Sequence, residues 1–119
     1  MFDWKRNLTV AKEISIKSDE QYYRAAISRA YYAAFGMARH YLEIKNFPYD
    51  NRDGSIHSKV WKSYSLLPNG KEIFVSGDRL KRLRITADYE SKINNPKGKS
   101  KQSIKYAEEI IQHIEKLCN

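Results

Sequence analysis

Apolar residues recur at intervals of three or four along most of the chain, and no stretch alternates between apolar and polar residues for more than a few positions. This spacing is typical of helices rather than strands. The longest helical stretch runs from Ser18 to Glu43. Because small side chains let a second helix approach closely, we expect this helix to be the most buried one, at the centre of a bundle. Its apolar face carries Ala26, Ala30, Ala33 and Met37, widened by Tyr31, Phe35 and Leu42.

The ends of this central helix carry recognisable signals. Ser18 with Gln21 three residues later resembles a capping box, so Ser18 is the expected N-cap. Asp19 and Glu20 place negative charge at the helix N-terminus, where it is favourable. The helix is expected to end near Lys45, because the following residues are rich in proline, glycine, asparagine and aspartate and predict a loop.

Shorter helices are predicted on both sides of the central one. The first is expected over residues 2–17, with an apolar face of Trp4, Leu8, Ala11 and Ile14. Another is expected over residues 55–67, where Ser55 is the candidate N-cap. Its apolar positions are Ile56, Val60, Tyr64 and Leu67, and the turn-forming sequence Pro68-Asn69-Gly70 ends it.

The C-terminal half is less regular. Residues 71–78 fit an apolar plug, a single helical turn or a brief extended piece, with Gly77 as its end. Asp78 is the expected N-cap of a helix over residues 79–91, whose buried stripe is Leu80, Leu83 and Ala87.

A second loop is predicted over residues 92–101, which contain Pro96, Gly98 and four lysines. Ser100 is the expected cap of the last helix, residues 101–118. Helices joined by short polar loops predict an all-α fold, a four- or five-helix up-and-down bundle. At 119 residues, the chain is expected to form one domain, residues 1–119.

Charge and cysteine content narrow the class of protein. The formal net charge is +8, which favours partners with phosphates or acidic surfaces. The one cysteine, Cys118, cannot form an internal disulfide or a zinc site. The chain contains neither a long apolar run nor a signal-peptide pattern, so we expect a cytoplasmic protein without membrane association. No metal or cofactor motif is found, and none is expected.

Three segments in order resemble the HEPN superfamily, in particular its small stand-alone members. Residues 28–35, Ser-Arg-Ala-Tyr-Tyr-Ala-Ala-Phe, are similar to the second-helix signature of that family. His57, followed by Val60 and Trp61, lies where such proteins often carry a histidine that opens the third helix. Residues 84–89, Arg-Ile-Thr-Ala-Asp-Tyr, resemble the Arg-x-x-Ala-Asp-Tyr variant of the family motif.

The resemblance implies a function as well as a fold. HEPN domains are helical bundles that pair as symmetric dimers, and many are metal-independent ribonucleases in toxin–antitoxin and phage-defence systems. Small members are often neutralised by a minimal nucleotidyltransferase. The resemblance therefore implies RNA, a homodimer and such an antitoxin as the expected partners.

This chain departs from the active family motif, which places a histidine four to six residues after an arginine. Five residues after Arg84 stands Tyr89, and Tyr89 is a poorer general base because its free pKa is about 10. Arg82, seven residues before Tyr89, gives a second possible frame for the motif. Arg84 and Asp88 are four residues apart and can pair, and the pair either aims the guanidinium or is an ordinary solvated salt bridge. His57 is the best candidate for the missing base. The candidate catalytic residues are Arg84, Tyr89, Asp88, Arg82 and His57.

Basic residues around the fourth predicted helix are the candidates for RNA contact, although lysines in a loop are also commonly just solvated. They are Arg79, Lys81, Lys97 and Lys99. Three functions remain open. The leading one is a HEPN-type RNA-cleaving toxin or defence subunit, and the second is a non-catalytic HEPN module that binds RNA, nucleotide or a nucleotidyltransferase. The third is a helical adaptor whose charge only aids solubility.

Overall fold

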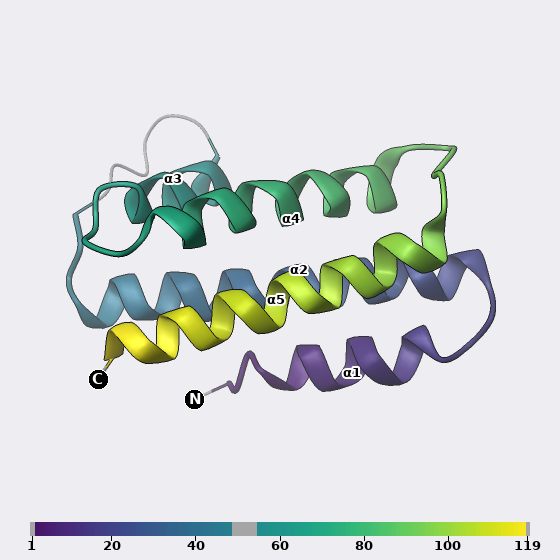
Figure 1. The fold of residues 1–119 in the computed structure, drawn as a ribbon, viewed down its shortest axis with the longest axis horizontal. Helices are drawn as coiled ribbons and strands as arrows, with labels where there is room; N and C mark the ends of the chain where they lie inside the picture. Colours follow the sequence, from purple (N-terminus) through teal and green to yellow (C-terminus); the bar gives the residue numbers. More distant parts are fainter. Residues whose placement is uncertain (1, 49–54, 119) are drawn as a thin grey trace.

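The structure is a computed structural model that describes residues 2–48 and 55–118. Within these residues the chain forms five helices and no strand (Figure 1), which confirms the predicted all-α bundle. The helices are α1 (Arg6–Ser15), α2 (Glu20–Ile44), α3 (Ile56–Tyr64), α4 (Lys71–Tyr89) and α5 (Pro96–Cys118). In the part of the chain that the structure describes, no helix is both long and apolar enough to cross a membrane.

The long helices alternate in direction, and α2 lies at the centre (Figure 1). α2 and α5 lie side by side, α1 packs along one side of this pair, and α4 packs along the other. The short α3 lies against α4 and α2. Because α2 contacts every other helix of the described chain, the central position predicted from its alanine stripe is confirmed.

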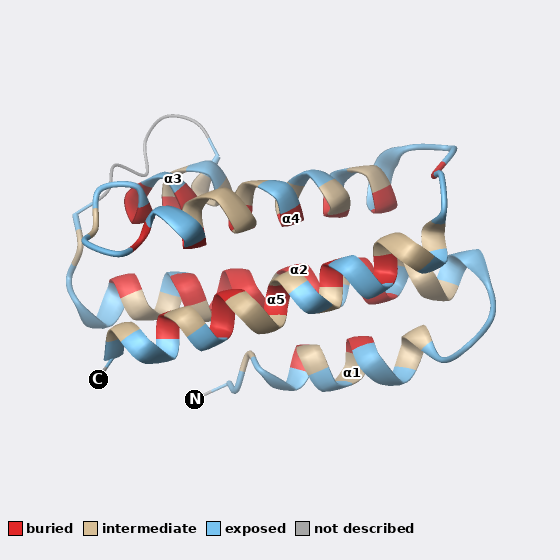
Figure 2. Ribbon diagram, in the orientation of Figure 1, coloured by how far each residue is buried: buried red, intermediate tan, exposed pale blue. Residues whose placement is uncertain are grey.

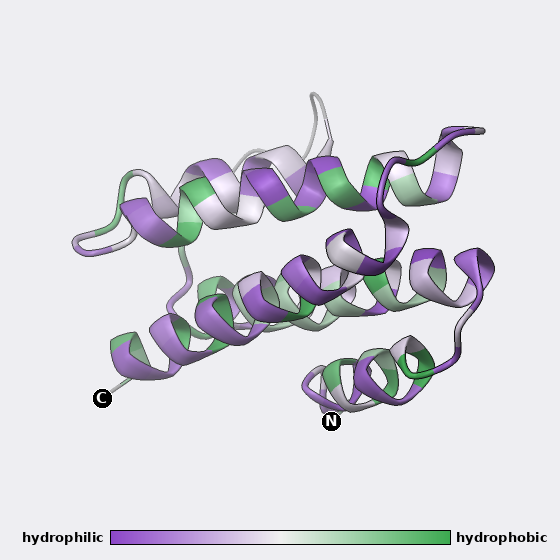
Figure 3. Ribbon diagram, turned by 45° about the vertical axis from the view of Figure 1, so that its right-hand side comes forward, coloured by the Kyte–Doolittle hydropathy of each residue, from purple (hydrophilic) through white to green (hydrophobic). Residues whose placement is uncertain are grey.

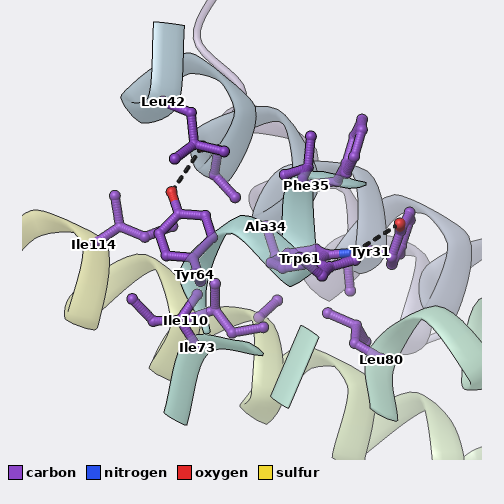
Figure 4. Close-up of a cluster of buried hydrophobic side chains, with 14 of the residues drawn as sticks. Tyr31, Ala34, Phe35, Leu42, Trp61, Tyr64, Ile73, Leu80, Ile110 and Ile114 are labelled. Carbon is purple, nitrogen blue, oxygen red and sulfur yellow. Dashed lines mark hydrogen bonds between the residues drawn. The ribbon is translucent and has the colours of Figure 1, made fainter. Parts of the chain in front are cut away.

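Buried residues face the interior of the bundle, and polar residues cover the outside (Figures 2 and 3). Aromatic side chains from α2 and α3 form the middle of the core, and isoleucines from α4 and α5 close it (Figure 4). The buried polar atoms of these rings are paired. The Tyr64 hydroxyl donates to the Ala38 carbonyl at 2.7 Å, and the Trp61 indole donates to the Tyr31 hydroxyl at 3.1 Å.

The side chains that cap the helix starts agree with the sequence prediction at α3 and differ from it at α2. Ser55 caps α3 as predicted, because its hydroxyl accepts from the His57 backbone N–H at 3.1 Å. At α2 the capping box was wrong: Asp19, with extended backbone, is the N-cap, and its carboxylate accepts from the Gln21 N–H at 3.2 Å. Aspartate serves this role as well as serine does.

α4 differs most from expectation, because it begins at Lys71 and runs through the segment 71–78 that the sequence left ambiguous. Gly77 is in the helix interior rather than at an end. A Cβ there would lie 2.2 Å from Cε3 of Trp61, so glycine is needed to let the indole pack against the helix. Asp78 is likewise not a cap, and its carboxylate pairs with Arg82 at 3.0 Å one turn later.

α5 begins at Pro96, five residues before the predicted start. Proline suits the first turn of a helix, where its missing N–H is not needed. The side chain of Asn95 accepts from the Gly98 N–H at 3.2 Å and satisfies this first turn. The expected cap Ser100 is instead buried within α5, and Lys97 and Lys99 lie in the first turn of the helix rather than in a loop.

Two other helices are shorter than predicted. α3 ends at Tyr64, and α1 spans Arg6–Ser15 and leaves Trp4 outside the helix. Trp4 lies instead against Gly36 of α2, where a Cβ would come within 2.1 Å of the indole Cδ2 atom. The N-terminal segment is therefore attached to α2 by a tryptophan–glycine contact like the one between Trp61 and Gly77.

The C-terminal end of α4 is held by a side chain of α2. The guanidinium of Arg24 donates to the carbonyls of Ala87, Glu90 and Ser91 at 3.0, 2.6 and 3.2 Å. It also pairs with Glu20 at 3.1 Å. Since the last carbonyls of a helix lack partners within the helix, Arg24 supplies the donors that α4 needs at this end.

Candidate functional site

Arg84 lies on the inner face of α4, together with the buried residues Leu80 and Ala87. Its side chain is 9% exposed. The guanidinium carbon lies 5.1 Å from the ring centre of Tyr31 and 5.8 Å from that of Tyr32, distances at which a cation is attracted to an aromatic ring. Arg84 is thus a buried cation, not the centre of a solvated surface pair.

The polar contacts of Arg84 are incomplete. Nη1 lies 3.7 Å from a carboxylate oxygen of Asp88, so the pair expected from the four-residue spacing is present. Asp88 in turn accepts from the hydroxyl of Ser28 at 3.5 Å. The Arg84 Nε has no hydrogen-bond partner among the described residues. A buried donor without a partner is unfavourable for stability, and such donors are often found at functional sites.

His57 joins the same group from the start of α3. Its Nδ1 lies 2.7 Å from the hydroxyl of Tyr31, and its ring stacks on Phe35 with centres 4.2 Å apart. Tyr31 also accepts from Trp61 at 3.1 Å. Because the indole can only donate, the Tyr31 hydroxyl accepts from it, and its own hydrogen can be donated to Nδ1 in the tautomer that carries the imidazole proton on Nε2.

Burial and nearby cations set the charge of these groups. Burial lowers the pKa of His57 below its usual 6.5, and Arg84, Lys81 and Arg39 lower it further. Burial raises the pKa of Tyr31 to about 12. Both rings are therefore neutral near pH 7. We call this group of residues the Arg84 cluster: Arg84, His57, Tyr31, Tyr32 and Asp88.

We expect an NMR titration to give His57 a pKa below 6.5, because its environment disfavours the imidazolium. The unfolded chain takes up this proton at a higher pH than the folded chain does. His57 therefore lowers the free energy of unfolding as the pH falls below about 6.5. The signal is assigned with a His57→Gln variant, and a measured pKa at or above 6.5 contradicts the buried setting.

The other candidate residues on α4 lie elsewhere. Arg82 is paired with Asp78 on the outer face, and Tyr89 is 74% exposed. Five residues turn a helix by about 140°, so Tyr89 and Arg84 point in different directions within one chain. Seven residues return almost to the same face, which places Tyr89 near the line of Arg82. Lys81 lies toward α3 and donates to Ser58 at 2.6 Å.

A shallow groove of about 260 Å³ lies between α4 and α5, and we call it the α4/α5 groove. Two of the expected RNA-contacting or catalytic residues, Arg79 and Arg82, line it. The sequence did not predict its α5 side, where Gln102 donates to the Tyr106 hydroxyl at 3.2 Å. The lining residues are Arg79, Arg82, Leu83, Thr86, Gln102 and Tyr106.

Sequence reasoning also missed the part that Tyr31 and Tyr32 play around Arg84, although both are within the segment that carries the resemblance. Their helical spacing indicated core packing, and nothing local shows which cation reaches them. In the described residues, no group of three or more His, Cys, Asp or Glu side chains is placed to hold a metal ion.

A family model supplies an independent comparison. The model of the HEPN domain matches residues 5–117 of the 119-residue chain. The chain belongs to the HEPN domain family. Among curated proteins and solved structures, nothing matches it. The matched region of this HEPN domain includes the Arg84 cluster and the α4/α5 groove, whereas Phe2 and Trp4 precede it.

Proposed function

We propose that this HEPN domain binds single-stranded RNA through the α4/α5 groove. The observation that carries the proposal is the convergence of Arg79 and Arg82 of α4 with Tyr106 of α5 around one hollow. A guanidinium matches phosphate oxygens and stays charged, and an aromatic ring offers a face on which a base stacks. Lys97 and Lys99, at the start of α5, extend the basic surface along the same helix.

Metal-independent RNA cleavage is the second candidate, and the observation that favours it is a neutral histidine beside a guanidinium in the Arg84 cluster. Cleavage of this kind needs a base for the 2′-hydroxyl and a cation for the phosphate. Two features place it second. Tyr31 occupies the Nδ1 of His57 at 2.7 Å, so only Nε2 is left to act on a substrate, and Arg84 is almost fully buried.

RNA binding and cleavage are measured with the same purified protein and a labelled single-stranded RNA in the presence of EDTA. We expect binding, and we expect Arg82→Gln to weaken it roughly tenfold, because a charge-assisted contact to phosphate contributes about 1.4 kcal/mol or more. Lys105→Gln removes the same charge from α5 outside the groove and is the control. Equal affinity of the wild type and Arg82→Gln contradicts the proposal.

Cleavage in EDTA that disappears in His57→Gln would move the second candidate to first place. General acid–base catalysis contributes about 100-fold or more, so the loss is easily measured. Intact RNA at every time point, with binding retained, identifies a non-catalytic module.

We also propose a homodimer with α4 near the two-fold axis. Ile85 and Tyr89 are one turn apart on the outer face of α4, and they are 37% and 74% exposed. Exposed apolar side chains next to each other are typical of an interface between subunits. Light scattering is expected to show a dimer that Ile85→Asn converts to a monomer, while Leu66→Asn, at another exposed apolar residue, leaves the dimer intact.

A role as a toxin neutralised by a nucleotidyltransferase is a proposal that rests on the family resemblance. It is supported by the 74% exposure of Tyr89 in the single chain, where a partner enzyme can reach its hydroxyl before the dimer proposed above covers it. Nucleotide added there would bring phosphate charge to the face of α4 that carries Arg82, and would compete with RNA. Mass spectrometry after incubation with the partner tests it: added mass must disappear in Tyr89→Phe.

A further inference from the structure

Three adjoining hollows lie between the N-terminal segment, α1 and α2, and together we call them the N-terminal groove. Their volumes are about 540, 410 and 240 Å³, and Phe2 borders each of them. The α2 side of the groove runs from Arg29 to Glu43, which is about 21 Å along the helix axis. Its length suits a segment of a polypeptide or a nucleic acid better than a single small molecule.

The lining of the N-terminal groove has the composition of a protein–protein interface. Tryptophan, tyrosine and arginine are the residues that contribute most to binding at such interfaces. The groove shares no lining residue with the α4/α5 groove, so the two surfaces can be tested separately. Its aromatic and arginine residues are Phe2, Trp4, Tyr32, Arg6, Arg29 and Arg39.

The aromatic rings of the groove are kept at the surface rather than in the core. Trp4 lies against Gly36 of α2, although glycine within a helix is less favourable than alanine. Phe2 packs edge-on against Trp4 with ring centres 4.8 Å apart and remains 57% exposed. Both residues precede the region that the HEPN domain model matches, so that region alone does not make this surface. Exposed apolar side chains gathered in one place are typical of a binding surface.

The polar side of the groove holds a cation in a fixed position. Asn7 is 7% exposed, and its side-chain oxygen accepts from Nη1 of Arg29 at 3.2 Å. This bond orients the guanidinium and leaves its other N–H groups to donate elsewhere. Among the described residues, neither Arg29 nor Arg6 has a carboxylate partner. A carboxylate of a ligand would supply one, because the fork of a guanidinium matches the two carboxylate oxygens.

Acidic residues at both ends of the groove favour a peptide over a nucleic acid. Asp3 and Arg6 line the hollow at one end, and Glu43 lines the hollow at the other. Glu43 is paired there with Arg39 at 3.1 Å. A nucleic-acid strand carries a phosphate on every nucleotide, so some of its charges would face these carboxylates and be repelled. A peptide can place one carboxylate opposite Arg29 and apolar side chains elsewhere.

The architecture around the groove indicates the conformation of the peptide. The described residues form no strand, so they offer no sheet edge to which an extended peptide could bind through its main chain. A helix instead presents apolar and acidic side chains at fixed positions on one face, which suits a groove that binds through side chains. A helix of about 14 residues matches the length of the groove.

We propose that the N-terminal groove binds an acidic amphipathic helix of a partner protein. An apolar or aromatic side chain of that helix packs among Phe2, Trp4 and Tyr32. A carboxylate one helical turn away binds the guanidinium that Asn7 holds in place.

Selection from a displayed library of random peptides tests this surface, with the purified full chain as the target. Among peptides of about 14 residues, we expect enrichment of those with an aromatic residue or leucine three or four positions from aspartate or glutamate. A synthetic peptide of an enriched sequence is then titrated by fluorescence anisotropy. Trp4→Ala and Arg29→Gln are each expected to weaken its binding about tenfold.

A third variant and two controls separate binding from folding. Phe2→Ala removes an exposed ring that packs on no helix core, so it keeps the fold, and it is expected to weaken the peptide about fivefold. Tyr22→Ala removes a ring of α2 that lies beside Lys17, outside the groove. Lys62→Gln removes an exposed positive charge of α3. Both controls are expected to leave the affinity for the peptide unchanged.

The proposal is overturned if no acidic apolar sequence is enriched, or if none of the three groove variants changes the affinity for an enriched peptide. Two other occupants are identified by the same proteins. Weaker binding of single-stranded RNA by Arg29→Gln, without an enriched peptide, assigns the groove to a nucleic-acid strand. A dimer in light scattering that Phe2→Ala dissociates assigns it to a second copy of the chain. Either result also overturns the proposal.

Discussion

An Arg84→Ala variant is expected to lose about 3 kcal/mol of the free energy of unfolding, whereas Arg84→Met is expected to stay within about 1 kcal/mol of the wild type. The side chain of Arg84 fills the space beside the rings of Tyr31 and Tyr32, so alanine leaves a cavity. Methionine fills much of that space and removes a buried charge. Asp88 is 28% exposed and can be hydrated once its partner is gone.

Chemical denaturation of the three proteins measures these differences. The comparison separates packing from function, because Arg84→Met keeps the volume and removes the charge. A loss of RNA binding or cleavage in Arg84→Met without a loss of stability assigns the guanidinium to function. If methionine is as destabilising as alanine, the buried charge itself stabilises the fold, and our interpretation of the incomplete contacts of Arg84 is wrong.

The second large effect is expected at Gly77. Helix propensity alone predicts that alanine is more favourable than glycine by about 1 kcal/mol. In this chain we expect Gly77→Ala to destabilise by about 2 kcal/mol, because its Cβ would lie 2.2 Å from the indole of Trp61, which is 2% exposed and enclosed by the core. The melting temperature is expected to fall by about 8 °C.

Gly36→Ala is the matched control, since its Cβ would approach Trp4 as closely, at 2.1 Å. Trp4 lies outside the helices and is only partly buried, so it can move away, and we expect a change below about 1 kcal/mol. If Gly77→Ala and Gly36→Ala destabilise the fold equally, the burial of the neighbouring tryptophan does not determine the cost of the added Cβ.

The sequence predicts those parts of the fold that depend on local signals and misses those that depend on distant contacts. The central helix was predicted closely, because the spacing of its apolar residues is a local signal. The sequence predicts Gly77 as the end of the ambiguous segment 71–78, since the reason to keep a glycine there is Trp61, which is distant in sequence. The start of α5 differs from the prediction for another reason. Pro96 is typical of a loop, but proline also suits the first turn of a helix.

The sequence identifies several residues of the candidate site, but it does not predict how they are arranged in space. Motif and position single out Arg84, Asp88 and His57, and the structure places Arg84 and His57 against Tyr31, with Asp88 beside Arg84. That Arg84 is buried was not predictable from its own helix, because charged residues are usually exposed and the rings that surround it come from α2. The grooves combine side chains from separate elements, which a single sequence does not place together.

The contact between Arg24 and the end of α4 changes how the net charge of +8 should be understood. Arg24 is engaged with three carbonyls and Arg84 with aromatic rings, so neither is free for a polyanion. Each phosphate of a single strand neutralised by a protein releases about 0.7 counterion. If four surface cations on α4 and α5 contact phosphates, a plot of log affinity against log salt concentration is expected to have a slope of about −3. Eight such contacts, one for each net positive charge, would give a slope about twice as steep.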